Sequence, residues 1–392
     1  MHRLHLKINY LLKKEINELY LMNAIRTFAI STIVVFIPIF LLIKGYGLAD
    51  IGLFYLIRAL TGILFCYTAL KYAAKKGVKH SLLLSIPFMT IFFISLYNID
   101  FLRTYMGDMT VLLCVAVLEA LASAYYYMGF HVEFAKLSEE KKSMKQLGFI
   151  QALSMIASVL GPLFGALVIT FASFNVLFLI VVGLLIISLV PLFMSGEYHE
   201  PFHFNLKQAL SVKQKERSAP FFAEGFHTMA AGIFWPMFMF LIAISINSIG
   251  GIYAVSNLVL VLFTLYLAKK ATEKNKHRIL KIGTALHALT LIIRTLLKTV
   301  ALIVLVQGFG ALTWTMVHIP FYSTFYNNSK KTGIANMIFF REIYLHAGRV
   351  LSCLLFLAIL HFLTPTTALV TAIIIGAVVM LFMARIKEEA AA

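Results

Sequence analysis

Long apolar segments recur along this chain from residue 19 to residue 386, and short polar turns separate them. A helix needs roughly 20 mostly apolar residues to cross the hydrocarbon core of a bilayer, which is about 30 Å thick. Hydrophobic residues make up 61% of the 392 residues and charged residues only 13%, a balance that excludes an ordinary soluble protein. The pattern predicts an all-α integral membrane protein with twelve transmembrane helices. These are expected at approximately 19–43, 50–73, 81–100, 109–136, 146–172, 175–196, 219–246, 251–269, 279–297, 299–327, 333–361 and 365–386.

Lysine and arginine gather in every second turn of this predicted topology. The basic turns occur around residues 71–79, 136–145, 207–217, 269–281 and 330–331. The other turns hold the cations Lys44, Arg103, Arg294 and Lys298 and all three aspartates, Asp50, Asp100 and Asp108. Because short cytoplasmic loops are enriched in lysine and arginine, we expect both termini to be cytoplasmic in a multi-pass protein of the plasma (cell) membrane. The net charge of +17 comes from these turns rather than from one basic face, so nucleic acid is not an expected partner.

The longest polar stretch, residues 197–218, divides the chain into two halves of six predicted spans each. It is predicted to be a cytoplasmic linker between an N-terminal bundle (19–196) and a C-terminal bundle (219–386). An amphipathic cytoplasmic leader (1–18) and a short tail (387–392) complete the chain. Residues 119–142 weakly resemble residues 310–331, as expected for parallel six-helix repeats of the kind found in alternating-access carriers.

The fifth predicted span contains a row of small residues beside a proline. Ala157, Gly161 and Gly165 recur every four residues, so they share a helical face that a neighbouring backbone can approach closely. Pro162 removes a backbone hydrogen bond from the same turn. With Gly148, this stretch resembles a fifth-span motif of proton-driven antiporters in the Major Facilitator Superfamily, with alanine replacing two of its glycines. The resemblance implies a tight contact with the eighth span that seals one side, and simple close packing is the alternative.

The turn after the second span is similar to a second motif of the same superfamily. Gly77 is retained together with the cations Lys75, Lys76 and Lys79, but Ala74 occupies the position of the family's aspartate. The aspartate-based gate of the family therefore cannot be carried over to this chain. Ordinary enrichment of cations in cytoplasmic turns is the alternative explanation for the lysines.

Ionisable residues inside the predicted spans are the main functional candidates, because each costs at least about 2.5 kcal/mol to insert into lipid. Glu119, Glu224 and His227 are candidates for proton coupling, since such groups can load and release a proton near neutral pH. The depth of Glu119 favours this role over a buried ion pair, whereas both roles stay open for Glu224. The family's fold implies that spans one, four, seven and ten line a central cavity. The cavity candidates on these spans are Asn23, Arg26, Ser123, Tyr126, Trp235, Gln307, Trp314 and His318.

The eleventh predicted span carries a second set of charges. Arg341, Glu342, His346 and Arg349 are expected to form a network with Arg58 of the second span that changes between inward-open and outward-open states. Structural ion pairing between helices is the alternative. The arginines within the spans outnumber the glutamates, which would suit an anionic substrate. Glu133 and His131, near the cytoplasmic exit of the fourth span, are expected to be interfacial.

These features predict a secondary active transporter that moves a small organic solute by alternating access, coupled to protons and suited to efflux. The alternatives are an organic-anion uptake or exchange carrier, a lipid flippase or scramblase, and an intramembrane lipid transferase. The sequence contains no Gly-x-x-x-x-Gly-Lys-Ser/Thr loop, which argues against direct ATP coupling. The three cysteines are far apart without metal-binding spacing, so neither a metal nor another cofactor is expected. We expect a monomer with no enzymatic activity, whose partners are its solute, protons and the bilayer.

Overall fold

The structure is a computed structural model that describes residues 2–137, 159–194, 202, 204–211, 217–270 and 275–388. These residues form helices and connecting turns, and none of the described residues lies in a β-strand. Gly148 and Ala157 of the fifth-span motif lie outside the described residues.

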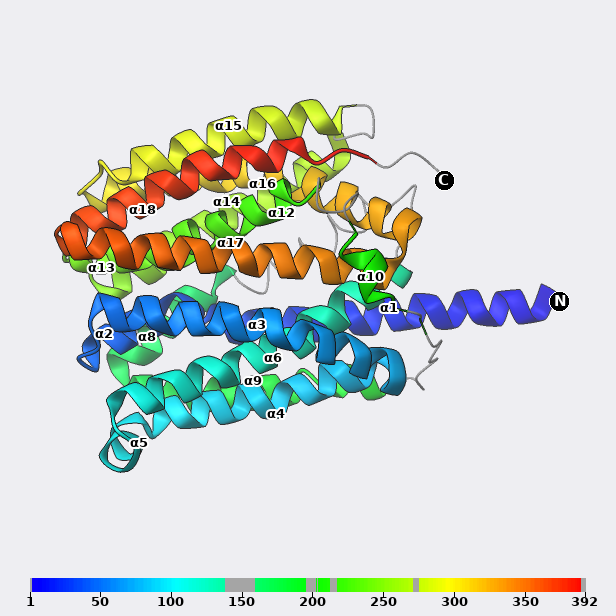
Figure 1. Cartoon of the computed structure of the whole chain (residues 1–392), viewed down its shortest axis with the longest axis horizontal. Coiled ribbons are helices and arrows are strands. Elements are labelled where there is room, and N and C mark those ends of the chain that lie inside the picture. Colours follow the sequence, from blue (N-terminus) through cyan, green and yellow to red (C-terminus); the bar gives the residue numbers. More distant parts are fainter. Residues whose placement is uncertain are drawn as a thin grey trace.

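The first half of the chain forms one group of helices, shown from blue to green at the bottom of Figure 1. Its members are α1 (His2–Ser31), α2 (Ile37–Ile43), α3 (Leu48–Lys76), α4 (Val78–Tyr97), α5 (Ile99–Met106), α6 (Asp108–Leu137), α8 (Gly161–Phe171) and α9 (Phe174–Ile187). Helix α1 runs without a break from the predicted leader into the first span and ends at Ser31, and α2 completes that span; the amino-terminal part of α1 projects beyond the bundle. The segment that forms α5 was predicted to be a connection between two spans. The helix has Asp100 in its first turn, and Gly107, whose φ is 78°, follows its last residue. An acidic first turn and a left-handed glycine are ordinary helix boundaries.

The second half forms the other group, at the top of Figure 1. Its members are α12 (Ala219–Met229), α13 (Trp235–Leu241), α14 (Ile246–Lys270), α15 (Lys276–Arg294), α16 (Val300–Thr332), α17 (Ile334–Phe362) and α18 (Pro365–Val379). The linker contains a one-turn helix, α10 (Leu206–Ala209), that contacts α17.

Among the described residues, nine helical segments are long and apolar enough to cross a membrane, and each coincides with a predicted span. The predicted span 146–172 is described only from residue 159. The predicted span 279–297 corresponds to α15, which has Lys276, Arg278 and Lys281 near its start and Arg294 at its end. The predicted span 219–246 is interrupted by a π-helical turn at Ala230–Phe234 between α12 and α13. Pro236 follows this turn and lacks the backbone N–H that a regular α-helix would need there.

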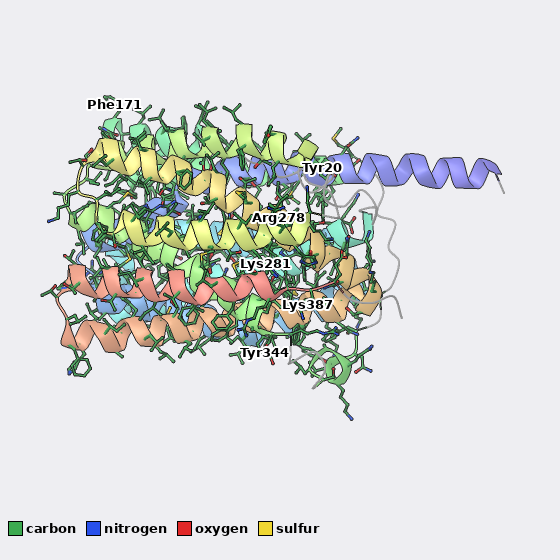
Figure 2. The ribbon with its side chains drawn as sticks, turned by 90° about the horizontal axis from the view of Figure 1, so that it is seen from above. Tyr20, Phe171, Arg278, Lys281, Tyr344 and Lys387 are labelled. Carbon is green, nitrogen blue, oxygen red and sulfur yellow. The ribbon has the colours of Figure 1, made fainter. Side chains whose placement is uncertain are left out.

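The two groups lie side by side with both termini at the same end of the molecule, here called the terminal end. The main contacts between the groups join α3 to α17 and α8 to α14. Arg278, Lys281 and Lys387 lie toward the terminal end, whereas Phe171 lies at the opposite end (Figure 2). The opposite end also holds α5, where Arg103 Nε donates to Asp108 Oδ1 at 2.8 Å.

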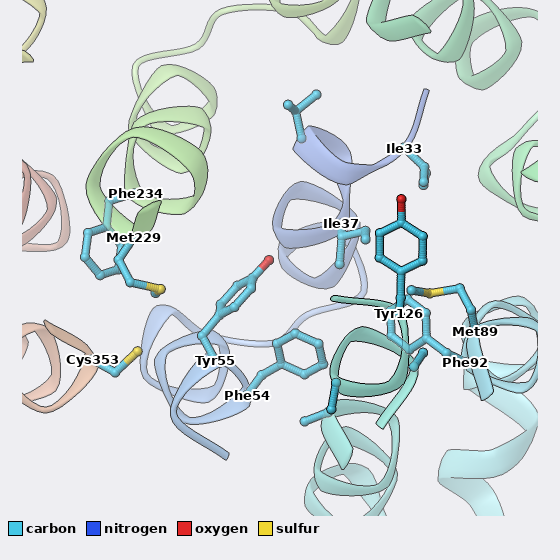
Figure 3. Packing of buried hydrophobic residues seen from close by; sticks show 14 of the residues in the cluster. Ile33, Ile37, Phe54, Tyr55, Met89, Phe92, Tyr126, Met229, Phe234 and Cys353 are labelled. Atoms are coloured by element: carbon cyan, nitrogen blue, oxygen red, sulfur yellow. The ribbon is translucent and has the colours of Figure 1, made fainter. Parts of the chain in front are cut away.

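One large apolar core extends across both groups. Figure 3 shows Phe54 and Tyr55 of α3 between Ile37 on one side and Met229, Phe234 and Cys353 of the second group on the other. In lipid, such helix contacts are stabilised by close van der Waals packing rather than by the hydrophobic effect. The groups therefore meet over an apolar surface that surrounds the polar residues described next.

Candidate functional site

Two neighbouring cavities lie among the helices. The first, here called the charged cavity, has a volume of about 340 Å³ and takes its lining from both groups: it includes Arg26, Tyr126, His131, Glu224, Tyr322, Tyr326, Arg341 and Glu342. The second, called the histidine cavity, has a volume of about 400 Å³ and includes His227, Tyr253, His287, Arg294, Gln307 and Trp314. Thr228 and Arg349 line both cavities. Arg349 Nε donates to Thr228 Oγ1 at 3.1 Å, so a hydrogen bond marks the boundary between them.

Arg341 of α17 is the central cation of the charged cavity. Its Nε donates to Glu224 Oε2 at 3.2 Å, and its Nη1 donates to Glu342. The hydroxyl of Tyr322 donates to Glu224 Oε1 at 2.5 Å. Arg341, Glu224 and Glu342 are each only 3% exposed. One buried guanidinium therefore serves two buried carboxylates, which leaves this trio with an excess negative charge when both are ionised.

His131 of α6 connects the first group to this trio. Its Nε2 lies 3.2 Å from Arg341 Nη1, and its Nδ1 lies 2.7 Å from the hydroxyl of Tyr326. An arginine N–H can only donate, so Nε2 accepts and a neutral His131 carries its proton on Nδ1. Phe134 packs beside the same tyrosine, with ring centroids 4.6 Å apart. α16 and α17 cover His131 and leave it 5% exposed.

The opposite wall of the charged cavity comes from α1 and α6. The Tyr126 hydroxyl donates to Asn23 Oδ1 at 2.5 Å. The Arg26 guanidinium lies over the Tyr126 ring, 3.3 Å from its centroid, in a cation–π contact. The structure thus brings three of the predicted cavity residues together on one wall.

Arg58 and Glu119 form a separate pair within the first group. Arg58 Nη2 donates to Glu119 Oε1 at 2.8 Å, and Arg58 Nε also contacts this carboxylate. Ser123 Oγ donates to the same Oε1 atom at 2.9 Å. Arg58 lines the histidine cavity, but Glu119 and Ser123 line neither cavity. Arg58 was predicted to join the α17 network, and its ion-pair partner is instead this glutamate.

A hydrogen-bonded histidine pair forms part of the histidine cavity. His287 Nδ1 lies 3.0 Å from the carbonyl oxygen of Gly310, and His227 Nε2 lies 3.1 Å from His287 Nε2. Because a carbonyl only accepts, His287 donates through Nδ1 and its Nε2 accepts from His227 Nε2. A neutral His227 therefore has a bare lone pair on Nδ1. Its ring stacks on Trp314, with centroids 4.0 Å apart.

Sequence reasoning missed several residues of these cavities. His287 and Arg294 lie on α15 and Tyr253 lies on α14, outside the four spans that the family resemblance assigns to a cavity. Arg294 was counted as a cation of an outer turn, yet it is only 3% exposed. Tyr322 and Tyr326 follow the predicted His318 at intervals of four residues on α16, and this helical spacing could have found them.

Other predicted residues fall in different places. Gln307 and Trp314 line the histidine cavity and His318 lines the charged cavity. Trp235 is fully buried, stacks on Phe238 with centroids 5.7 Å apart, and lines neither cavity. His346 also lines neither; it packs where Gly62 leaves room for its ring.

The glycines of the fifth-span motif face the first helix. A Cβ at Gly165 would overlap the backbone oxygen of Thr32, and one at Gly161 would overlap Ser31. Pro162 instead faces α14, where its carbonyl oxygen would lie 2.7 Å from a Cβ at Gly250. Gly77 has a φ of 106° and joins α3 to α4, a conformation that favours glycine. Among the described residues, no group of three or more His, Cys, Asp or Glu side chains is placed to hold a metal ion.

Comparison with known proteins identifies the fold and the family. The family model for the Major Facilitator Superfamily matches residues 19–351. No curated protein sequence matches the chain. The human organic anion transporter MFSD10 (TETRAN) has a similar structure, with a TM-score of 0.65 at 10% identity over 95% of this chain and 99% of that chain. The E. coli fucose:proton symporter FucP gives a TM-score of 0.64 at 12% identity over 96% of this chain and 98% of its own. FucP in the outward conformation gives 0.65 at 11% identity over 96% of this chain and 100% of its own.

Proposed function

Because the chain belongs to the Major Facilitator Superfamily, we propose that it is a secondary transporter that carries a small organic solute across a membrane by alternating access. The observation that carries the proposal is a charged cavity lined by both helix groups, with a contact of His131 to Tyr326 and Arg341 that joins the two groups. Carriers of this kind rock one half against the other around a site near the middle of the bilayer. This cavity and the neighbouring histidine cavity, which share Thr228 and Arg349, are together the expected location of such a site.

We propose that the contact of His131 with Tyr326 and Arg341 closes the charged cavity toward the terminal end. His131 lies in the last third of α6 and Tyr326 in the last third of α16, and both helices run from the α5 end toward the terminal end. Opening toward the terminal end separates these two helices and breaks the 2.7 Å contact. The contact is therefore the proposed gate at this end.

The trio of Arg341, Glu224 and Glu342 is the proposed proton site. Adding one proton to either carboxylate leaves a neutral one-to-one pair, which lowers the cost of burying the trio. Glu119 differs, because it already forms a one-to-one pair with Arg58 and its protonation would leave that cation uncompensated. The proposal therefore assigns proton coupling to the trio in preference to Glu119. His227 contributes a hydrogen-bond acceptor instead.

The distribution of charge supports a topology of twelve spans with both termini in the cytoplasm. The terminal end carries Arg278, Lys281 and Lys387. At the opposite end, Lys44 pairs with Asp100 and Arg103 pairs with Asp108. Short cytoplasmic loops are enriched in lysine and arginine.

Counterflow in proteoliposomes tests the proposed function. Vesicles containing the full-length protein are loaded in turn with sugars, amino acids and small organic acids, and entry of the labelled solute is measured. Saturable counterflow of at least one solute is expected. A proton gradient directed into the vesicles, with the outside more acidic, should accelerate net uptake. Movement of labelled lipid without counterflow of any solute would contradict the proposal and indicate a scramblase.

Cross-linking tests alternating access at the proposed gate. In a variant without its three native cysteines, His131→Cys and Tyr326→Cys are joined by a short bismaleimide, which should arrest counterflow because the halves can no longer separate there. The matched control joins Tyr72→Cys to Tyr125→Cys, two residues of the first group whose rings are 5.7 Å apart. The control cross-link should leave counterflow unchanged. Full counterflow with the gate cross-linked would refute the gate.

A further inference from the structure

Arg294 is a buried cation without a counter-ion. Its side chain is 3% exposed, and no acidic side chain among residues 17–136, 159–194, 217–264 and 275–388 forms an ion pair with it. Its Nε is buried and has no hydrogen-bond partner in the same part of the chain. The guanidinium lies 5.8 Å from the centroid of the Trp235 ring, a distance at which a cation–π contact is weak compensation. Leaving a buried cation unpaired is costly, which points to a ligand that supplies the missing charge.

Gly310 leaves the space that the Arg294 guanidinium occupies. A Cβ at Gly310 would overlap Nη2 of Arg294, so any side chain there would displace the cation. The carbonyl oxygen of Gly310 meanwhile accepts from His287 Nδ1 at 3.0 Å, which fixes the histidine pair beside it. The same turn of α16 thus positions both the cation and the histidines of the cavity.

Three other polar groups of the histidine cavity have no hydrogen-bond partner among the described residues. They are the Tyr253 hydroxyl, Gln307 Oε1 and His227 Nδ1. Gln307 and His227 are each 6% exposed. The Tyr253 hydroxyl can donate, whereas Gln307 Oε1 and the bare lone pair of His227 Nδ1 can only accept. Buried polar groups normally have hydrogen-bond partners. A ligand that pairs with these four groups would carry a negatively charged acceptor for the cation, an acceptor for the hydroxyl, and donors for the two acceptors.

We propose that the histidine cavity binds a small hydroxy acid, with its carboxylate at Arg294 and Tyr253 and its hydroxyl groups donating to Gln307 and His227. This assignment rests on the proposed transport function and names the class of its solute. The volume of about 400 Å³ suits a compound of this size. Arg58 of the same cavity is already neutralised by Glu119, so a ligand with one negative charge at Arg294 would compensate the second of these two arginines. A carboxylate supplies that charge, whereas a phosphate monoester carries nearly two.

Calorimetric titration of the purified full-length protein tests the ligand class. The probes are glycerate and gluconate, each compared with the acid that lacks hydroxyls (propionate, hexanoate) and with the polyol that lacks the acid (glycerol, sorbitol). At least one hydroxy acid should bind saturably, and its acid and polyol counterparts should bind roughly 10- to 100-fold more weakly, because each leaves buried polar groups unpaired. The proposal is overturned if neither hydroxy acid binds, or if glycerol 3-phosphate binds more tightly than glycerate.

Two variants test the position of the site. Arg294→Met removes the cation and should weaken binding of the hydroxy acid roughly 10- to 100-fold. Gly310→Ala keeps the charge but displaces the guanidinium, and should weaken binding in the same direction. The matched control is Gly308→Ala on the same helix, where the added Cβ would meet only Val259 Cγ2 at 3.7 Å. Binding should be unchanged in this control, and unchanged binding in Arg294→Met would refute the site.

Counterflow separates the failure of this inference from the failure of the proposed function. If a hydroxy acid binds in an Arg294-dependent way but no solute is exchanged, the transport proposal is wrong and the binding site stands. If a neutral solute is exchanged at the same rate by wild type and Arg294→Met, and no hydroxy acid binds, the transport proposal stands and the hydroxy-acid site is wrong.

Discussion

Arg58 and Arg294 line the same cavity from opposite halves of the molecule, yet their surroundings differ. Arg58 meets Glu119 through two of its nitrogens, and Ser123 donates a further hydrogen bond to that carboxylate. Arg294 has no acidic partner in the described part of the chain and occupies a space that Gly310 leaves open. The first arginine is internally compensated, whereas the second is compensated only when something else enters the cavity.

This difference shows that the number of buried charges is less informative than their pairing. Breaking a buried ion pair leaves an uncompensated charge in a low-dielectric environment and lowers stability. Removing a cation that was never paired takes an uncompensated charge away and should not lower stability. The two arginines should therefore respond to the same substitution with opposite signs. The following predictions test this contrast, beginning with the largest expected effect.

Replacing Arg58 with methionine should destabilise the protein by about 3 kcal/mol, the low end for a buried pair, because Glu119, whose side chain is 15% exposed, loses its counter-ion. The midpoint of thermal unfolding in detergent and lipid should fall accordingly. The control is the double variant Arg58→Met with Glu119→Met, in which the pair is replaced by apolar side chains and stability should be largely restored. A double variant as unstable as the single one would show that the pair is not what stabilises this region.

Replacing Ser123 with alanine should cost about 1–2 kcal/mol, since it removes one hydrogen bond to a charged carboxylate but leaves the Arg58 pair in place. The same unfolding measurement applies. Ser85→Ala serves as the control, because the Ser85 hydroxyl donates to the backbone oxygen of Leu82 in its own helix and touches no charge. Equal losses of stability in the two variants would indicate that the hydrogen bond from Ser123 to Glu119 contributes no more than an ordinary serine hydrogen bond.

Sequence reasoning reached the fold and the family more fully than the site. Apolar length located the nine long apolar helical segments seen in the described part of the chain, and the degenerate motifs around Gly77 and Pro162 indicated a superfamily that the comparison confirmed. Helical spacing also found Asn23, Arg26 and Tyr126, because residues on adjacent turns share a face.

The pairing of charges was beyond reach of the same reasoning. Arg58 and Glu119 are separated by 61 positions, and His131 and Arg341 by 210, so their contacts depend on how whole helices pack. The depth of Glu119 made it the leading proton carrier by sequence, although nothing along the chain reveals the arginine that neutralises it. Arg294 looked like an ordinary loop cation because its place at the end of a polar helix hides its burial.

Replacing Arg294 with methionine should leave the ligand-free protein as stable as wild type or raise its unfolding midpoint slightly. The substitution removes an unpaired buried cation and fills its space with a flexible apolar side chain. Midpoints measured without added acids give the comparison with Arg58→Met. A loss of stability as large as in Arg58→Met would mean that Arg294 is compensated within the protein, and the contrast between the two arginines would fail.

A small and pH-dependent effect is expected at Glu388, where a carboxylate near the end of the chain pairs with Lys276 at the start of α15. The hydrogen bond from Lys276 lowers the pKa of Glu388 below its ordinary value of 4.5. The pair therefore contributes its full stability at pH values above the ordinary pKa of a glutamate. That contribution is lost as the pH falls through the lowered pKa of Glu388 in the folded protein. Because the Glu388 side chain is 40% exposed, Glu388→Gln should cost less than about 1 kcal/mol at pH 7, and the difference from wild type should vanish in acid. Unfolding midpoints of both proteins between neutral pH and pH about 3 provide the measurement. A deficit that persists in acid would show that the side chain acts by packing rather than by charge.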